Sequence, residues 1–273
     1  MESHYVADAD SVYKILSYER LIVIDARPQD VYDQGHIPGA VNIPPSRLEE
    51  DRQLRSGAVV HRLLGPVERA RQVFQQAGIE ETSKIVLYDD GGAPNAARLW
   101  WILDYLGHPN IQILDGGMQA WEQDVGEIST EAPHRHHGNW RPEPLDYRFA
   151  DFVHLITSIR SGSVTLCNSL PYEEYARGAI PGSESVPYTE TFENGRFPSL
   201  KSSKELLELF RERNVRPEKE VVFYCDEGYS AAQDYFAARV AGFQRVRVYD
   251  GSMEDWTGRG GDLLPYGGAD LQP

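Results

Sequence analysis

The residue in this sequence whose type and position best suit covalent chemistry is Cys225. It follows the apolar run Val221–Tyr224, which has the length and composition of a buried strand. A five-residue loop comes next, and then a segment with helical spacing from Ala231. A thiol at the carboxyl end of a parallel strand lies where α/β proteins bind their ligands. The next helix would point its positive end at that loop. We therefore predict a nucleophilic thiol with a depressed pKa.

The loop after Cys225 is the candidate binding segment, and it consists of Asp226, Glu227, Gly228, Tyr229 and Ser230. Gly228 can adopt a positive φ, which lets several backbone N–H groups converge on one point. Ser230 has two predicted roles, a hydrogen bond to the sulfur of Cys225 or the N-cap of the following helix. The two carboxylates of the loop oppose the depressed pKa, because negative charge beside a thiol favours its protonated form.

Composition limits the class of protein. The chain has 273 residues, of which 41% are hydrophobic and 25% charged, a balance typical of globular proteins. The formal net charge of -15 would repel phosphate backbones and anionic lipids, so nucleic acid and membrane surfaces are excluded as expected partners. Solubility explains this acidity, and preference for a basic partner protein is the alternative interpretation.

The cellular compartment is predicted from the cysteines and the N-terminus. Two cysteines do not make the disulfide framework of a secreted domain, so a reducing compartment fits. Cys167 lies inside the predicted strand Val164–Cys167, where we expect core packing. Met1–Asp10 is polar and lacks the features of a signal peptide, and no apolar run reaches the roughly 18 residues of a membrane span. We expect a cytoplasmic protein.

The elements that must position Cys225 occur twice in the chain. Residues 21–44 align without a gap to residues 164–187, and residues 84–121 match residues 220–256. A repeat of this length indicates a duplicated domain rather than a solenoid. The matched residues are Pro28 with Pro171, Tyr32 with Tyr175, Gly35 with Gly178, Ile37-Pro38-Gly39 with Ile180-Pro181-Gly182, Pro44 with Pro187, Tyr88 with Tyr224, Asp115-Gly116 with Asp250-Gly251, and Trp121 with Trp256.

Each half alternates short apolar strands with helical segments, which predicts an α/β fold with a parallel sheet flanked by helices on both faces. We expect an N-terminal domain at residues 1–130, a linker at 131–147 and a C-terminal domain at 148–273. The linker is rich in proline and histidine. Its His134, His136 and His137 match no metal-binding spacing and have no accompanying cysteine or carboxylate cluster, so we predict no metal site.

Two motifs carry a family resemblance. The segment Tyr32–Ile43 contains the pattern aromatic-x3-His-Ile-Pro-Gly-Ala, and Asp115-Gly-Gly with Trp121 and Asp250-Gly-Ser with Trp256 form a second motif. Both resemble the signatures of rhodaneses, and their tandem arrangement resembles the two-domain thiosulfate and mercaptopyruvate sulfurtransferases. The resemblance implies two rhodanese-like domains and a sulfurtransferase. The sequence gives no sign of a metal or organic cofactor.

In that family the catalytic cysteine is the first residue of a six-residue loop in the C-terminal domain, here Cys225. The resemblance implies that its thiolate takes a sulfur from a small donor as a persulfide and passes it to a thiol, to cyanide or to a sulfur-carrier protein. The loop N–H groups would stabilise the sulfur anion. Asp89 occupies the matching position in the first half, which predicts a catalytically inactive N-terminal domain. Trp100 and Trp101 are candidates for an interface between the domains or for core packing.

The sequence departs from the family pattern around Cys225. The first half has Asp25-Ala26-Arg27 after its first strand, whereas the second half has Asn168-Ser169-Leu170 and lacks the arginines that meet an anionic donor. Together with the acidic loop, this change disfavours thiosulfate and favours a protein persulfide or a low-molecular-weight persulfide as donor. Arg177 and Arg196 remain as candidate anion contacts.

Two other functions are alternatives for a chain of this fold. Phosphatases and arsenate reductases that share the fold use Cys-x5-Arg, but the sixth residue after Cys225 is Ala231, so the oxyanion clamp is missing. A non-catalytic rhodanese pair that binds partners or relays a signal is the remaining alternative. The retained Cys225, Gly228 and Ser230 oppose it, and persulfide formation on Cys225 would distinguish the two.

Overall fold

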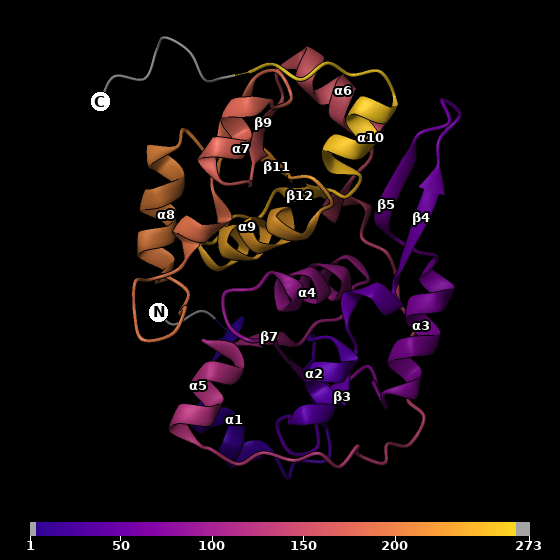
Figure 1. The fold of residues 1–273 in the computed structure, drawn as a ribbon, viewed down its shortest axis with the longest axis vertical. Coiled ribbons are helices and arrows are strands. Elements are labelled where there is room, and N and C mark those ends of the chain that lie inside the picture. The colour runs from indigo at the N-terminus through magenta and orange to yellow at the C-terminus, as the bar shows by residue number, and fades with distance from the viewer. Residues whose placement is uncertain (1–3, 266–273) are drawn as a thin grey trace. The chain divides into compact units, whose positions relative to one another are not determined.

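A computed structural model of the chain describes residues 4–265, which form two compact units (Figure 1). Unit 1 contains residues 4–49, 64–145 and 192–201, and unit 2 contains residues 50–63, 146–191 and 202–265. Each half of the sequence thus contributes a short segment, 50–63 or 192–201, to the unit formed mainly by the other half. The repeat gave no sign of this exchange. The predicted domain limits of 1–130 and 148–273 with a linker at 131–147 stay predictions.

Unit 1 is built on a five-stranded parallel sheet in the order β1-β7-β6-β2-β3. Its strands are β1 (Val6–Ala7), β2 (Leu21–Asp25), β3 (Val41–Asn42), β6 (Lys84–Tyr88) and β7 (Ile111–Leu114). One face of the sheet forms a buried apolar cluster with α1 (Ala9–Ile15) and α5 (Gly117–Asp124). The remaining elements are α2 (Gln29–Gln34), the 3-10 helix η1 (Pro45–Arg47), α3 (Val67–Gln76) and α4 (Asn95–Tyr105).

Unit 2 repeats this plan in a five-stranded parallel sheet of order β10-β9-β11-β12-β8. Its strands are β8 (Phe149–Ala150), β9 (Val164–Asn168), β10 (Ser183–Ser185), β11 (Glu220–Tyr224) and β12 (Val246–Tyr249). Helices α6 (Phe152–Ser161) and α10 (Ser252–Gly258) pack on one face, and α8 (Ser203–Glu212) and α9 (Tyr229–Val240) on the other (Figure 1). The remaining helices are α7 (Tyr172–Arg177) and the 3-10 helices η2 (Asp146–Arg148) and η3 (Tyr188–Thr191). The predicted fold of two parallel sheets with helices on both faces is confirmed.

The residues that repeat in the sequence make the same bonds in both units. In unit 1 the Tyr88 hydroxyl, at the end of β6, accepts a hydrogen bond of 3.1 Å from the backbone N–H of Ile37. In unit 2 the Tyr224 hydroxyl accepts one of 2.9 Å from Ile180. The Ile-Pro-Gly turn is thereby tied to the central strand, and this explains why the tyrosine and the turn occur together in each half.

A two-stranded hairpin of β4 (Glu49–Gln53) and β5 (Val59–Leu64) was not predicted from the sequence. Its middle part belongs to unit 2, where the Ser56 hydroxyl donates a 2.6 Å hydrogen bond to the carbonyl of Gly258 on α10. The strand β4 consists of polar residues only, and the apolar periodicity that marks a buried strand is absent from it. The position of β4 is therefore set by contacts between residues that are far apart in the sequence.

Residues 131–145 form no helix or strand and are bonded to unit 1. The backbone N–H of Trp140 donates to the carbonyl of Ile79 at 3.2 Å, and the Gln75 amide donates to the carbonyl of Trp140 at 2.9 Å. Trp100 and Trp101 of α4 are both buried, and the indole N–H of Trp100 donates to the carbonyl of Ile111 on β7. Across residues 4–265, the structure contains no helix with both the length and the apolar character needed to cross a membrane.

Candidate active site

Cys225 lies directly after β11 and is 2% exposed. The backbone N–H of Gly228 donates to its Sγ atom at 3.0 Å, and the backbone N–H groups of Glu227 and Ala231 also act on the sulfur. Gly228 has φ 86° and caps the N-terminus of α9, a conformation that glycine adopts without steric cost. The loop therefore directs backbone donors at one sulfur atom, and such an arrangement stabilises an anion there.

The predicted depressed pKa of Cys225 is wrong for this structure. Burial raises the pKa of the thiol, the backbone N–H groups of Ala231, Glu227 and Gly228 oppose that rise, and the nearby Asp226 carboxylate adds to it. The sequence indicated the donors and the opposing carboxylate correctly, but it did not reveal how completely the sulfur is removed from water. Desolvation disfavours the charged thiolate and outweighs the donors.

The raised pKa gives a testable pH dependence. Iodoacetamide is an uncharged reagent that reacts only with the thiolate. We expect its rate of reaction with Cys225 to rise with pH throughout the range in which an ordinary cysteine ionises, and to keep rising above that range. In Asp226→Asn one cause of the raised pKa is removed, so the midpoint should move to lower pH. Peptide mass spectrometry of time points at each pH measures the rate at Cys225 separately from Cys167. A midpoint below that of free cysteine would contradict the burial effect.

Ser230 has neither of its two predicted roles in the structure. The N-cap of α9 is Gly228, and α9 begins at Tyr229, so Ser230 already lies inside the helix. A different hydroxyl lies beside the sulfur. Ser252 Oγ is 4.0 Å from Sγ of Cys225, accepts the Cys225 backbone N–H at 3.1 Å and donates to the carbonyl of Tyr249 at 2.9 Å. The only signal for Ser252 in the sequence was its place in the repeated Asp-Gly turn.

Ser252 has φ 48°, an uncommon conformation for a residue with a side chain. Gly117 is its counterpart in unit 1 and has φ 57°. We expect Ser252→Ala to destabilise the protein by about 1–3 kcal/mol, because the buried N–H of Cys225 loses its acceptor. Ser252→Gly should be more stable than Ser252→Ala by about 1 kcal/mol, because glycine removes the strain. Urea unfolding of the two variants measures the difference, and equal stability of Ser252→Ala and the parent would refute this role.

Acidic side chains of unit 2 gather around the loop. Burial raises the pKa of the Asp226 carboxyl, and the carboxylates of Glu174, Glu227 and Glu254 raise it further. These residues come from α7, the loop and α10, so three elements place negative charge near Asp226. The Asp226 carboxylate, next to Cys225 in the chain, adds negative charge beside the sulfur and disfavours its thiolate form.

The hairpin supplies two basic side chains to the same region. Arg62 Nη1 lies 2.7 Å from Glu227 Oε2, and its guanidinium carbon is 5.6 Å from the ring centre of Tyr229. His61 Nδ1 lies 3.1 Å from Glu254 Oε1, and the pKa of His61 is raised by its hydrogen bond to that carboxylate. The sequence did not connect these residues to the site, because they precede Cys225 by more than 160 positions.

The matching loop of unit 1 holds a carboxylate where unit 2 holds the sulfur. Asp89 is 4% exposed and accepts hydrogen bonds of 2.9 Å from the backbone N–H groups of Gly91 and Ala96. Burial raises the pKa of Asp89 to about 6 against these two donors. The loop thus keeps its anion-binding geometry, but a carboxylate has no sulfur to exchange.

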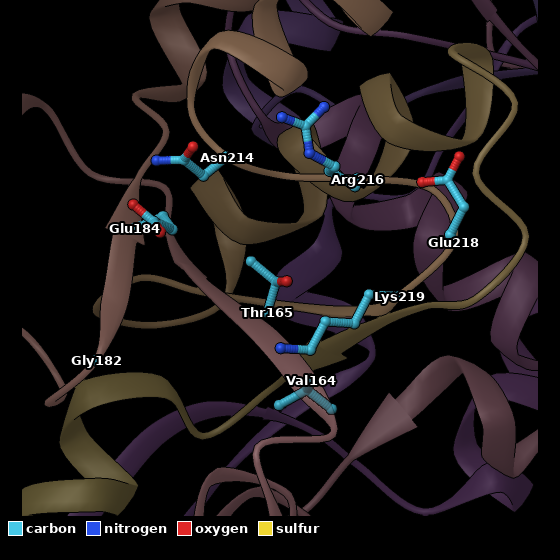
Figure 2. A pocket seen from close by; sticks show the side chains of 8 residues that line it. All are labelled: Val164, Thr165, Gly182, Glu184, Asn214, Arg216, Glu218 and Lys219. Carbon is cyan, nitrogen blue, oxygen red and sulfur yellow. The ribbon is translucent and has the colours of Figure 1, made fainter.

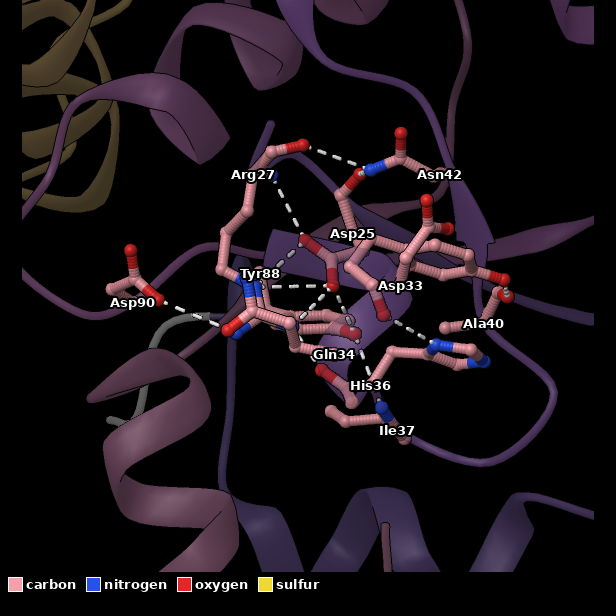
Figure 3. Close-up of polar contacts among 12 residues, drawn as sticks. Asp25, Arg27, Asp33, Gln34, His36, Ile37, Ala40, Asn42, Tyr88 and Asp90 are labelled. Carbon is pink, nitrogen blue, oxygen red and sulfur yellow. Dashed lines mark hydrogen bonds and ion pairs between the residues drawn. The ribbon is translucent and has the colours of Figure 1, made fainter. Parts of the chain in front are cut away.

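Unit 1 also retains the arginine that unit 2 has lost (Figure 3). Arg27 Nη2 lies 2.6 Å from Asp25 Oδ2, and Arg27 Nη1 lies 3.4 Å from Asp90 Oδ1. In unit 2, Asn168 is aligned with Asp25, Leu170 with Arg27 and Asp226 with Asp90. Leu170 is buried, and the side-chain nitrogen of Asn168 is buried without a hydrogen-bond partner among the described residues.

The structure also places the other residues that the sequence singled out. Arg196 belongs to the segment that packs in unit 1, and Arg177 is exposed at the end of α7. Cys167 is fully buried in β9, paired in register with Phe223, as expected for core packing. Among residues 4–265, no group of three or more histidine, cysteine or acidic side chains is arranged to hold a metal ion.

Comparison with known proteins identifies relatives over most of the chain. The family model described as the rhodanese-like domain matches residues 8–124 and 155–259. The thiosulfate sulfurtransferase of Pseudomonas aeruginosa is 27% identical over 252 residues, covering 88% of this chain and 89% of that protein. The probable 3-mercaptopyruvate sulfurtransferase of the same organism is 29% identical over 277 residues, covering 94% and 96%.

Among solved structures, SseA from Escherichia coli, a 3-mercaptopyruvate sulfotransferase with the rhodanese fold, superimposes with a TM-score of 0.81. The match covers 91% of this chain and 98% of that chain at 24% sequence identity. At this identity the likeness concerns the fold. The two matched segments of the family model correspond to the two repeated halves that the sequence predicted.

Proposed function

Because the chain belongs to the rhodanese-like domain family, we propose that this sulfurtransferase moves a sulfane sulfur from a donor to a thiophilic acceptor through a persulfide on Cys225. The observation that carries the proposal is the convergence of backbone N–H groups on Sγ, led by Gly228 at 3.0 Å. When Cys225 acts as the nucleophile, its thiolate is stabilised by backbone N–H groups that are already in position before the reaction begins.

The proposed reaction has two displacement steps. In the first, the Cys225 thiolate attacks the outer sulfur of the donor, a new S–S bond forms, and the old bond to that sulfur breaks with its electron pair leaving on the donor residue. In the second, an acceptor thiolate or cyanide attacks the outer sulfur of the Cys225 persulfide, and the Cys225 thiolate leaves. No oxidant or reductant is consumed, and one difficult transfer becomes two easier ones.

The binding loop of this proposal comprises Asp226, Glu227, Gly228, Tyr229 and Ser230. Gly228 contributes its backbone N–H, Glu227 contributes both a backbone N–H and a carboxylate, and Asp226 contributes negative charge. Unit 1 would not react, because Asp89 fills its loop with a carboxylate. We therefore assign catalysis to the second half of the chain and an inactive role to the first.

The donor we favour is a persulfide rather than thiosulfate. Leu170 replaces the arginine of the first half, and the Asp226 carboxylate lies next to Cys225, so we expect a dianion to be repelled at the reacting end. The relatives' names make thiosulfate and 3-mercaptopyruvate the other candidates. A thiol, cyanide or a sulfur-carrier protein would accept the sulfur, and we propose the cytoplasm as the compartment.

A steady-state comparison tests this function. We expect purified protein to transfer sulfur to dithiothreitol with a higher kcat/KM from glutathione persulfide than from 3-mercaptopyruvate or thiosulfate. A clear preference for thiosulfate would overturn the donor assignment. Absence of turnover with all three, together with no sulfur on Cys225, would favour the non-catalytic rhodanese pair instead.

A further inference from the structure

Within unit 2, the described charges around Cys225 are unbalanced. Four carboxylates, those of Glu174, Asp226, Glu227 and Glu254, are present near the loop, and two basic side chains from the hairpin pair with Glu227 and Glu254. Within residues 4–265, neither Asp226 nor Glu174 has an ion-pair partner. The unpaired negative charges are thus those of Asp226, next to Cys225, and of Glu174 on α7.

In unit 1 the carboxylate at the matching position is one of two partners of a guanidinium, and the nearer partner is Asp25 at 2.6 Å. Asp90 is aligned with Asp226, and its carboxylate is paired with the guanidinium of Arg27 at 3.4 Å (Figure 3). That guanidinium also donates to the carbonyl of Gly35 at 2.8 Å and lies 5.5 Å from the ring centre of Tyr88. In unit 2 the arginine is Leu170, so the carboxylate remains while its internal cation has been removed.

The acidic residues do not by themselves define a binding site. The position of the site is given by the Cys225 sulfur, because the transferred sulfur must react there. The backbone donors that converge on Sγ of Cys225 fix the point at which any substrate must react, and Asp226 is the next residue along the chain. A substrate whose sulfur reaches Cys225 therefore brings its neighbouring atoms close to Asp226, on which the other carboxylates act. The second transfer step is the more demanding, because an acceptor thiolate then approaches an anionic persulfide beside the Asp226 carboxylate.

We propose that the thiol which takes the sulfur from Cys225 carries a cationic group, an ammonium or a guanidinium, a few bonds from its own sulfur, and that Asp226 and Glu174 bind that group. This inference rests on the proposed function, since it names the acceptor class of the same site. In the transfer, the acceptor thiolate attacks the outer sulfur of the persulfide, its new S–S bond replaces the one to Cys225, and the Cys225 thiolate leaves. The cation offsets the negative charge of the attacking group.

Two small thiols of matched length provide the probe. Cysteamine and 3-mercaptopropionate each have two carbons between the sulfur and the charged end, and they carry opposite charges. Protein is first loaded with sulfur and its mass is measured, and the loss of that sulfur is then followed with each thiol. The discrimination ratio is the rate with cysteamine divided by the rate with 3-mercaptopropionate. Intrinsic reactivity of the thiols cancels when this ratio is compared between variants.

We expect the ratio to fall about fivefold in Asp226→Asn, because one partly exposed ion pair with the cationic group is lost. The ratio should fall further in the double variant Asp226→Asn with Glu174→Gln, which loses a second such pair. The matched control is Glu218→Gln, which removes the same charge from the loop that precedes β11 (Figure 2). The five residues of β11 separate it from Cys225 by about 17 Å at roughly 3.3 Å per residue, so its ratio should stay unchanged.

Different results would overturn the cationic acceptor and the sulfurtransferase function. Protein that loads with sulfur but shows the same ratio in the parent and in Asp226→Asn overturns the cationic acceptor and leaves the sulfurtransferase standing. An equal fall in Glu218→Gln also overturns it, because the effect would then reflect net charge alone. Protein that never gains sulfur overturns both. A ratio that falls only in the two variants near the loop, and falls less at high salt, supports the inference.

Discussion

Cys225→Ser is expected to lose sulfur transfer by at least about a thousandfold while keeping its fold, the largest effect of any single substitution in this protein. Serine places an oxygen where Sγ lies and keeps the hydrogen-bond geometry with Gly228 and Ser252. A hydroxyl cannot form a persulfide, so the covalent route is closed while the loop remains intact. Transfer rates to dithiothreitol and circular dichroism of the same preparation measure both properties.

Cys167→Ser is the matched control for this experiment. Cys167 is the second cysteine of the chain, and its fully buried position in β9 gives it no route to a substrate. We expect this variant to keep its fold and to transfer sulfur at the parental rate, because the substitution leaves the loop around Cys225 unchanged. Full activity in Cys225→Ser, or loss of activity in a folded Cys167→Ser, would contradict the assignment of the nucleophile.

Gly228→Ala is expected to slow sulfur loading about 100-fold, the usual effect of removing one preorganised donor from an anion site. Gly228 has φ 86°, and a Cβ atom in this left-handed conformation costs roughly 1–2 kcal/mol. The loop would relax toward negative φ, and the N–H that donates to Sγ at 3.0 Å would turn away. Pre-steady-state loading, followed by quenched mass spectrometry, gives the rate constant.

Gly182→Ala separates backbone strain from the loss of the donor. Gly182 belongs to unit 2, has φ 79°, and an added Cβ would meet no atom within 4 Å. The strain should therefore destabilise this variant by about 1 kcal/mol, as in Gly228→Ala, without changing the loading rate. If both variants slow loading equally, the N–H of Gly228 has no special part in stabilising the sulfur.

Local sequence patterns were sufficient for the fold and for the position of Cys225. The apolar run before it forms β11, the glycine after it adopts positive φ, and the repeat correctly placed Asp89 in the equivalent loop. These features depend on residues close together in the chain or on a comparison of its two halves. The parallel sheets follow for the same reason, since strands and helices alternate in each half with clear apolar periods.

The remaining features depend on contacts between distant residues. The hairpin reaches the loop through Arg62 and Glu227, and nothing in its polar sequence indicates that contact. Ser252 lies beside Sγ because the turn after β12 folds against the end of β11, which a one-dimensional pattern does not show. The direction of the pKa shift of Cys225 depends on burial, a property of the assembled unit, and it was therefore predicted wrongly.

Intact-protein mass spectrometry tests the central claim most directly. Purified protein is incubated in turn with thiosulfate, 3-mercaptopyruvate and glutathione persulfide, with Cys225→Ser and Cys167→Ser treated in parallel. We predict a species one sulfur atom heavier in the parent and in Cys167→Ser, most complete with glutathione persulfide and absent in Cys225→Ser. No added sulfur from any donor, or the same gain in Cys225→Ser, would contradict a persulfide on Cys225 as the carrier of the transferred sulfur.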